Sequence, residues 1–115
     1  MKGNDNIKTI INLIQEKKGY DITILDIRKQ SSLTDFFIIC SSDSDPQTRS
    51  IANYLKKELS KLKIKPYQIE GLTDLDWILM DYYNIVIHIF RNEIRKYYNI
   101  ERLWADAKIE MIKND

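Results

Sequence analysis

The sequence predicts a single α/β domain, in which a mixed sheet of about five strands is flanked by helices. Two stretches repeat apolar residues with the spacing of an α-helix, and short runs rich in Ile, Phe and Tyr, typical of strands, lie between and after them. The chain of 115 residues, with 43% hydrophobic and 30% charged residues, is long enough for one hydrophobic core. We therefore expect one domain over residues 1–115, with its core at about 5–107.

The N-terminal stretch predicts a helix at Asn4–Lys18, followed by two strands. Isoleucines at positions 7, 10, 11 and 14 form one apolar stripe along this helix, and Gly19 favours the left-handed turn that ends it. Ile22–Ile27 is rich in β-branched residues and predicts the first strand. Phe36–Ser41 is apolar at almost every position, which is typical of a central strand covered on both faces.

The middle of the chain predicts a long helix and a third strand. Asp45 is the expected N-cap and Pro46 the first helical residue, and the helix runs to about Lys63. Pro66–Glu70 predicts a short strand. Because a strand, a helix and a strand in succession imply a parallel crossover, whereas hairpins are antiparallel, the sheet should be mixed.

The stretch Asp76–Phe90 predicts a hairpin that contains two unusual residues. Trp77 stands where the first strand begins, and a large aromatic residue there either closes the core or anchors an interface. His88, the only histidine, interrupts an otherwise apolar strand. From the residues alone, a core histidine with a backbone or acidic partner is favoured for it.

The C-terminal part predicts two shorter helices and a tail. Ile94, Tyr97 and Tyr98 share one side of the first, and Asn99 can cap the second, which holds Trp104. Residues 108–115 show little pattern and are expected to fray.

Charge and cysteine content narrow the class of function. A formal net charge of +1 lacks the basic surplus typical of a nucleic-acid binder, so no DNA partner is expected. One cysteine allows neither a disulfide nor a cysteine zinc site within one chain and suggests a reducing, cytoplasmic location. No apolar run has the length of a membrane span, so no membrane partner is expected.

The residues give weak support to catalysis. Cys40 lies in an apolar strand, where cysteine is usually inert, and it could pair with His88 only if their strands were neighbours. Asp74 and Asp76, with Asp81 nearby, could hold a metal for nucleotidyl transfer. The loop before Pro46, however, has no glycine and carries two acids that would repel phosphate. We therefore expect a binding module without catalytic, metal-binding or cofactor-binding residues.

Several motifs carry a resemblance to a known family. In chain order they are Ser31–Ile39 (SSLTDFFII), Glu70-Gly71, Asp76–Tyr82 (DWILMDY), Val86–Phe90 (VIHIF) and Arg95–Trp104 (RKYYNIERLW). Together they resemble the ribosomal silencing factor family (iojap-related, YbeB-like proteins) over nearly the whole chain. The resemblance implies a nucleotidyltransferase-like fold without the catalytic site.

The resemblance also implies a function. Family members are translational repressors that bind the large ribosomal subunit through large-subunit ribosomal protein number fourteen and sterically block joining of the small subunit under nutrient limitation. A large-subunit assembly or maturation factor is the second interpretation, and a metal-dependent nucleotidyltransferase the third. The sequence leaves open a homodimer, formed through exposed strand edges or the same apolar surface.

Carried over position by position, the resemblance implies an interface with the ribosomal protein. The implied residues are Trp77, Ile78, Asp81, Tyr82, Glu70, Asp76, His88, Arg95, Tyr98 and Trp104. The first four are the expected anchors, and for His88, Arg95, Tyr98 and Trp104 the motif does not separate packing from contact. Many relatives have glycine near position 42 and Gly-Asp at the hairpin turn, where this chain has Ser42 and Tyr83-Asn84. Asn tolerates a positive φ, so a turn is still expected, but Tyr83 tolerates it less well and the motif does not fix the shape of the turn.

Overall fold

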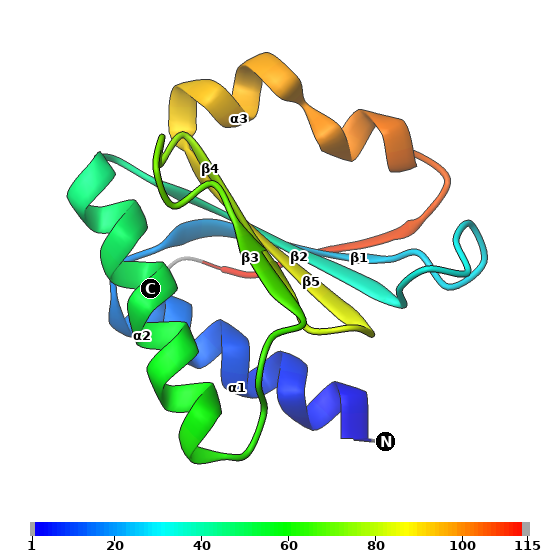
Figure 1. Ribbon diagram of the computed structural model, residues 1–115. Helices are drawn as coiled ribbons and strands as arrows, with labels where there is room; N and C mark the ends of the chain where they lie inside the picture. Colours follow the sequence, from blue (N-terminus) through cyan, green and yellow to red (C-terminus); the bar gives the residue numbers. More distant parts are fainter. Residues whose placement is uncertain (1, 114–115) are drawn as a thin grey trace.

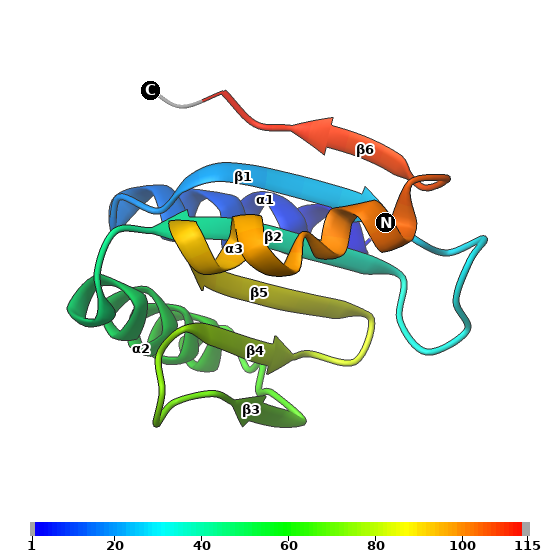
Figure 2. The same ribbon diagram turned by 90° about the horizontal axis from the view of Figure 1, so that it is seen from above.

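The computed structural model describes residues 2–113, and within them one open sheet separates two layers of helix (Figure 1). The strand order is β3-β4-β5-β2-β1-β6. The strands are β1 (Tyr20–Asp26), β2 (Phe36–Ser42), β3 (Gln68–Glu70), β4 (Trp77–Asp81), β5 (Ile85–Arg91) and β6 (Lys108–Met111). Helices α1 (Lys2–Glu16) and α2 (Asp45–Lys61) cover one face, and α3 (Asn92–Tyr98) with the 3₁₀ helix η1 (Ile100–Trp104) lies over the other (Figure 2).

Strands β2 and β5 form the parallel centre of the sheet. Their register runs from Phe36 opposite Ile85 to Ser42 opposite Arg91, and all other neighbouring strands pair antiparallel. The predicted mixed sheet is thereby confirmed. The crossover through α2 leads to β3, which lies at the sheet edge with β4 and β5 between it and β2.

The pleat of the strands divides the core into two parts. The α1/α2 side contains Ile38, Cys40, Ile87 and Ile89 together with the predicted isoleucine stripe of α1 and with Ile51, Leu55 and Leu59 of α2. The α3 side contains Leu25, Ile27, Ile39 and Phe90, with Ile100 of η1 packed on them. Successive residues of one strand point to opposite faces, so β2 and β5 contribute to both parts.

The long helix α2 begins one residue earlier than predicted. Ser44, not Asp45, is the N-cap, and its Oγ accepts a hydrogen bond from the backbone N–H of Gln47 at 3.2 Å. Pro46 stands in the first turn as expected. Ser42 is buried, and its hydroxyl shares a hydrogen bond with Thr48.

The expectation that residues 108–115 fray is wrong for the part that the structure describes. Lys108–Met111 forms β6, which pairs with β1 from Lys108 opposite Asp26 to Met111 opposite Thr23. All four β6 residues are exposed, so the short alternation of polar and apolar residues in this strand corresponds to no buried face. Backbone hydrogen bonds to β1 hold this edge strand, and they make six strands where about five were predicted. Residues 114–115 lie outside the described residues.

The helices of residues 2–113 include none with the length and apolar character of a membrane span.

Replacing Leu55 with Ala should lower the free energy of unfolding by about 2–5 kcal/mol, since Leu55 is fully buried between α2 and the sheet and its loss leaves a cavity. Lys56→Ala, on the exposed side of the same helix, should change it by less than about 0.5 kcal/mol. Chemical denaturation of both variants checks the packing, and equal effects would contradict it.

Candidate functional site

Aromatic rings from three strands, α3 and η1 form a continuous cluster on the α3 side of the sheet. We call it the aromatic cluster, and its members are Phe37, Trp77, His88, Phe90, Tyr97, Tyr98 and Trp104. The Trp77 ring is stacked on Phe90 at 4.7 Å between centroids and lies 5.2 Å from Tyr98. Phe37 contacts His88 at 4.5 Å and Trp104 at 5.4 Å, both edge to face.

Strand register brings these rings together. Trp77 of β4 stands opposite Phe90 of β5, while His88 of β5 stands between Leu79 of β4 and Ile39 of β2. Residues that are opposite each other across two strands share a face, so Trp77, His88 and Phe90 all project toward the α3 layer.

The aromatic cluster has a buried floor and an exposed rim. Phe90 and His88 are 0% and 3% exposed, whereas Tyr97 and Tyr98 are 81% and 53% exposed. Trp77 and Trp104 are half-buried between them. Leu103 of η1, 78% exposed, adds an apolar side chain to the same layer. Exposed aromatic residues on a packed floor are typical of protein interfaces.

His88, in the floor of the aromatic cluster, is held in its neutral form with one defined tautomer. The indole Nε1–H of Trp77 donates a hydrogen bond to His88 Nδ1 at 3.0 Å. Nδ1 can accept only without a proton, so the neutral ring carries its proton on Nε2. Burial lowers the pKa of His88 to about 3, because a charged ring would lose its hydration there. Nε2 has no hydrogen-bond partner among the described residues.

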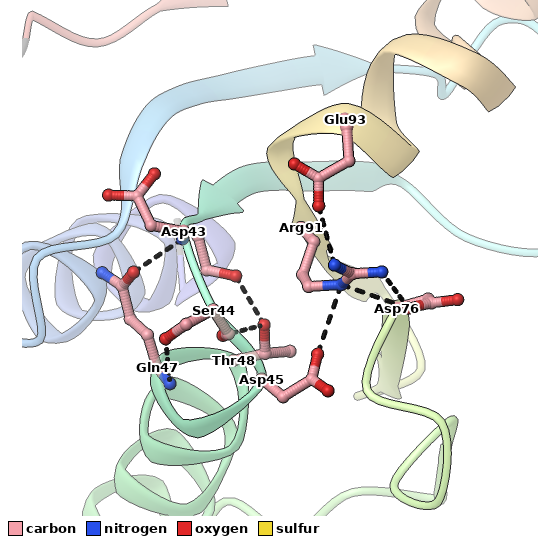
Figure 3. A network of polar contacts seen from close by, with 9 residues as sticks. Asp43, Ser44, Asp45, Gln47, Thr48, Asp76, Arg91 and Glu93 are labelled. Carbon is pink, nitrogen blue, oxygen red and sulfur yellow. Dashed lines mark hydrogen bonds and ion pairs between the residues drawn. The ribbon is translucent and has the colours of Figure 1, made fainter.

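Arg91, at the end of β5, fixes the chain just before Trp77 (Figure 3). Its guanidinium donates to Asp76 Oδ1 at 2.6 Å and forms ion pairs with Asp45 at 3.2 Å and Glu93 at 2.8 Å. The backbone N–H of Arg91 also donates to the Asp76 carbonyl at 3.1 Å. One cation therefore links the start of β4 to the first turns of α2 and α3. Exposed ion pairs add little stability, but this fork geometry restricts position.

Arg95 connects α3 to the sheet. Its guanidinium donates to the Asp21 carbonyl, to the Ser41 and Thr23 hydroxyls and to the Glu101 carboxylate, at 2.6–3.2 Å. Only 9% of the residue is exposed. This side chain holds the α3 layer in place and is not available to a partner.

Comparison with known proteins gives the family of this chain. A family model described as "Ribosomal silencing factor during starvation" matches residues 2–115. The chain belongs to the ribosomal silencing factor family. A curated relative named "Ribosomal silencing factor RsfS", from Halalkalibacterium halodurans, is 34% identical over 107 residues, which cover 93% of this chain and 92% of the relative.

A solved structure and a mouse protein are also similar to this chain. A crystal structure of a protein from Chromobacterium violaceum superposes with a TM-score of 0.88 at 30% identity, covering 99% of this chain and 96% of that one. "Mitochondrial assembly of ribosomal large subunit protein 1" from Mus musculus is 31% identical over 103 residues, covering 87% of this chain and 45% of the mouse protein. The predicted α/β fold, a mixed sheet flanked by helices, is therefore confirmed.

The structure divides the residues that the silencing-factor motifs implied. Ile78 and Tyr82 are 0% and 5% exposed and belong to the core on the α1/α2 side. Since neighbouring strand residues point to opposite faces, Ile78 cannot share a surface with Trp77. The expectation that Ile78 and Tyr82 lie on a contact surface is wrong. His88 and Arg95 are buried as well, so among the aromatic residues that the motifs implied, Trp77, Tyr98 and Trp104 keep ring surface at the exterior.

Three of the residues that the motifs implied are acids, at different places along β3 and β4. Glu70 is exposed beside Leu79, on the face that carries Trp77, and accepts a hydrogen bond from Gln68. Asp76 is held by Arg91. Asp81 accepts a hydrogen bond from the backbone N–H of Tyr83 at 2.8 Å, and Tyr83 adopts a positive φ of 71°. Asp81 thus stabilises the turn between β4 and β5.

The catalytic arrangements considered from sequence are not assembled. Cys40 and His88 lie on neighbouring strands but point to opposite faces, and burial raises the pKa of Cys40 to about 12. Asp76 and Asp81 flank opposite ends of β4, and at roughly 3.3 Å per residue they are on the order of 15 Å apart. Residues 2–113 contain no group of three or more His, Cys, Asp or Glu side chains placed to hold a metal.

Sequence reasoning missed Phe37, Tyr97 and Leu103 as surface residues of this site. Phe37 looks like one more core residue in an apolar strand, and only the strand order shows that its face opens toward η1. Tyr97 follows the helical spacing of Ile94, yet α3 is too short to bury both. No local signal marks Tyr97 as exposed, because adjacent helix positions can both face the core, as Ile10 and Ile11 of α1 do.

Arg95→Met should lower the free energy of unfolding by about 3–5 kcal/mol, because Thr23, Ser41 and the Glu101 carboxylate would lose their shared donor. Lys96→Met, at the exposed neighbouring position, should change it by less than about 0.5 kcal/mol. Urea unfolding of both proteins is the measurement. A stable Arg95→Met variant would contradict the structural role.

Acid should destabilise the folded chain through His88. The unfolded chain binds this proton near pH 6.5 and the folded chain only near pH 3, so between these values the unfolded state holds more protons and stability rises with pH. Above pH 6.5 His88 no longer lowers the free energy of unfolding. Between pH 7 and pH 5 the free energy of unfolding falls by on the order of 2 kcal/mol. His88→Leu should lack this loss. Parallel slopes for both proteins in denaturation at several pH values would refute the assignment.

Proposed function

We propose that this chain is a translational repressor that binds the large ribosomal subunit with its aromatic cluster. The docking partner is large-subunit ribosomal protein number fourteen, and the consequence is that the small subunit cannot join under nutrient limitation. The observation that carries the proposal is the exposed aromatic rim on a fixed floor, in a chain of the ribosomal silencing factor family. We place the protein in the cytoplasm, with the ribosomes for which its bacterial relatives are named.

Affinity would come from a few aromatic anchors. Tyr98 and Trp77 combine large apolar surface with a polar group, and such residues dominate the binding energy of many interfaces. Trp77 is already held by Phe90 and His88, so binding would cost little additional ordering of its ring. Glu70 at the margin of the aromatic cluster would speed association with a basic ribosomal protein more than it would tighten binding.

The mechanism is steric occlusion. The described chain measures 35 × 34 × 29 Å, so a bound copy on the subunit-joining face fills space that the small subunit would need. An interface of about 800 Å² on each partner suffices for specific binding. No reaction is required, and the repressor acts for as long as it stays bound.

A large-subunit assembly or maturation factor is the second candidate. The mouse relative, named for mitochondrial assembly of the ribosomal large subunit, favours it. Both functions would use the same docking surface, so binding measurements alone do not separate them. A subunit-joining assay does, because only a silencing factor lowers the yield of joined ribosomes from mature subunits.

A homodimer would compete with ribosome binding if it used the aromatic cluster. The alternative is pairing through β3 or β6, the two edges of the open sheet, where backbone groups are free for another strand. Light scattering of the wild-type chain and of Tyr98→Ala separates these two forms of dimer.

Tyr98→Ala should weaken co-sedimentation with isolated large subunits about tenfold and weaken the block of subunit joining equally, because Tyr98 is an exposed ring packed on Trp77. The matched control is Tyr83→Ala. Tyr83 is exposed to a similar degree, 63% against 53%, but lies at the β4–β5 turn outside the aromatic cluster.

The control should bind within about twofold of wild type, and both variants should unfold at the wild-type temperature. If Tyr98→Ala binds as wild type does, the docking surface lies elsewhere. If the wild-type chain itself does not bind large subunits, the proposed function is refuted.

A further inference from the structure

The position of Trp77 depends on more than packing. Its ring lies at the first residue of β4, where the chain enters the sheet from a loop, and one edge of it reaches the surface. An indole ring in such a place could turn about its side-chain bonds, and its N–H would find water in several orientations. In this structure the N–H instead points inward, to a single buried acceptor.

That acceptor is Nδ1 of His88, at 3.0 Å from Trp77 Nε1. The remaining contacts of the indole ring are the stacked ring of Phe90 and the tilted ring of Tyr98. Packing against Phe90 and Tyr98 restricts the plane of the indole ring. An indole turned over within that plane would pack against the same two rings nearly as well. The hydrogen bond distinguishes the two edges of the ring and therefore selects one orientation.

His88 is a poor choice for stability alone. It is 3% exposed, its Nε2–H has no hydrogen-bond partner within the described chain, and Phe37 lies edge to face against it. A buried donor without a partner is unfavourable, and an apolar side chain of similar volume would avoid it. The histidine side chain nevertheless provides a flat ring, which fits between Phe37 and Trp77, and one acceptor atom directed at the indole.

We propose that His88 is a positioning residue that holds the Trp77 indole in its binding orientation through the Nε1–H···Nδ1 hydrogen bond. The inference rests on the proposed function, because Trp77 is taken to contact the partner. His88 itself touches no partner, since its ring lies below the rim of the cluster. Its effect on binding therefore passes through Trp77.

The test compares His88→Leu, which keeps apolar volume without an acceptor, with His88→Asn, whose side-chain oxygen can accept from the indole. The readouts are the indole N–H signal of Trp77 in nitrogen-15 NMR spectra and co-sedimentation with large subunits. The chain has two tryptophans, so Trp104→Phe assigns the signals. Thermal unfolding at pH 7 shows that each variant is folded.

His88→Leu should retain or exceed wild-type thermal stability, should shift the Trp77 indole signal and speed its exchange with water, and should weaken binding about tenfold. His88→Asn should restore both the signal and most of the binding. A residue that only filled space would give the reverse order, since Leu would substitute for it better than Asn.

A double-mutant cycle separates this role from general packing. Trp77→Phe keeps a ring on Phe90 but removes the N–H, so adding His88→Leu to it should cause no further loss of binding. Additive losses would overturn the inference, as would wild-type binding by His88→Leu. Both results leave the proposed function intact, whereas a wild-type chain that fails to bind large subunits refutes that function and not the hydrogen bond seen by NMR.

Discussion

Strands β2 and β5 run parallel over seven residue pairs at the centre of the sheet, and the helices pack on the two faces of the sheet that this pair centres. The side chains alternate between the faces, so a single pair of strands supplies two different surfaces. One face meets the apolar stripes of α1 and α2 and is closed. The other carries His88, Phe90 and Phe37 and is only partly covered by α3 and η1. The two-sided burial of this pair therefore determines where a binding surface can exist.

The open face is stabilised by polar groups that are placed one by one. Arg95 joins α3 to β1 and β2, Arg91 joins the start of β4 to two helices, and His88 accepts from Trp77. Such polar contacts tolerate less displacement than apolar packing does, because each group needs its partner at hydrogen-bond distance. They also restrict the rings above them, which suits a surface that must keep one shape. The α1/α2 side, where Ile51 and Leu55 are fully buried, contributes stability instead.

Periodicity was sufficient for most of the fold, because α1, α2 and the central strands each bury a regular pattern of side chains. It failed for β6, whose four residues are exposed and held by backbone bonds alone. For the site, the family motif located the correct stretch but did not distinguish its two faces. Applying strand alternation to Trp77 and Ile78 would have separated them from sequence alone. The partners of His88 and Arg95 depend on which strands are neighbours, and no local pattern contains that information.

The central claim is that the aromatic cluster is the surface that docks on the large ribosomal subunit. A cryo-electron microscopy map of the chain bound to isolated large subunits tests it most directly. The account predicts that α3, η1 and the start of β4 face the ribosomal protein, with Trp77, Tyr97 and Tyr98 covered and α1 and α2 directed away. A map in which α1 or α2 forms the contact, and the tyrosines of α3 remain exposed, would contradict it.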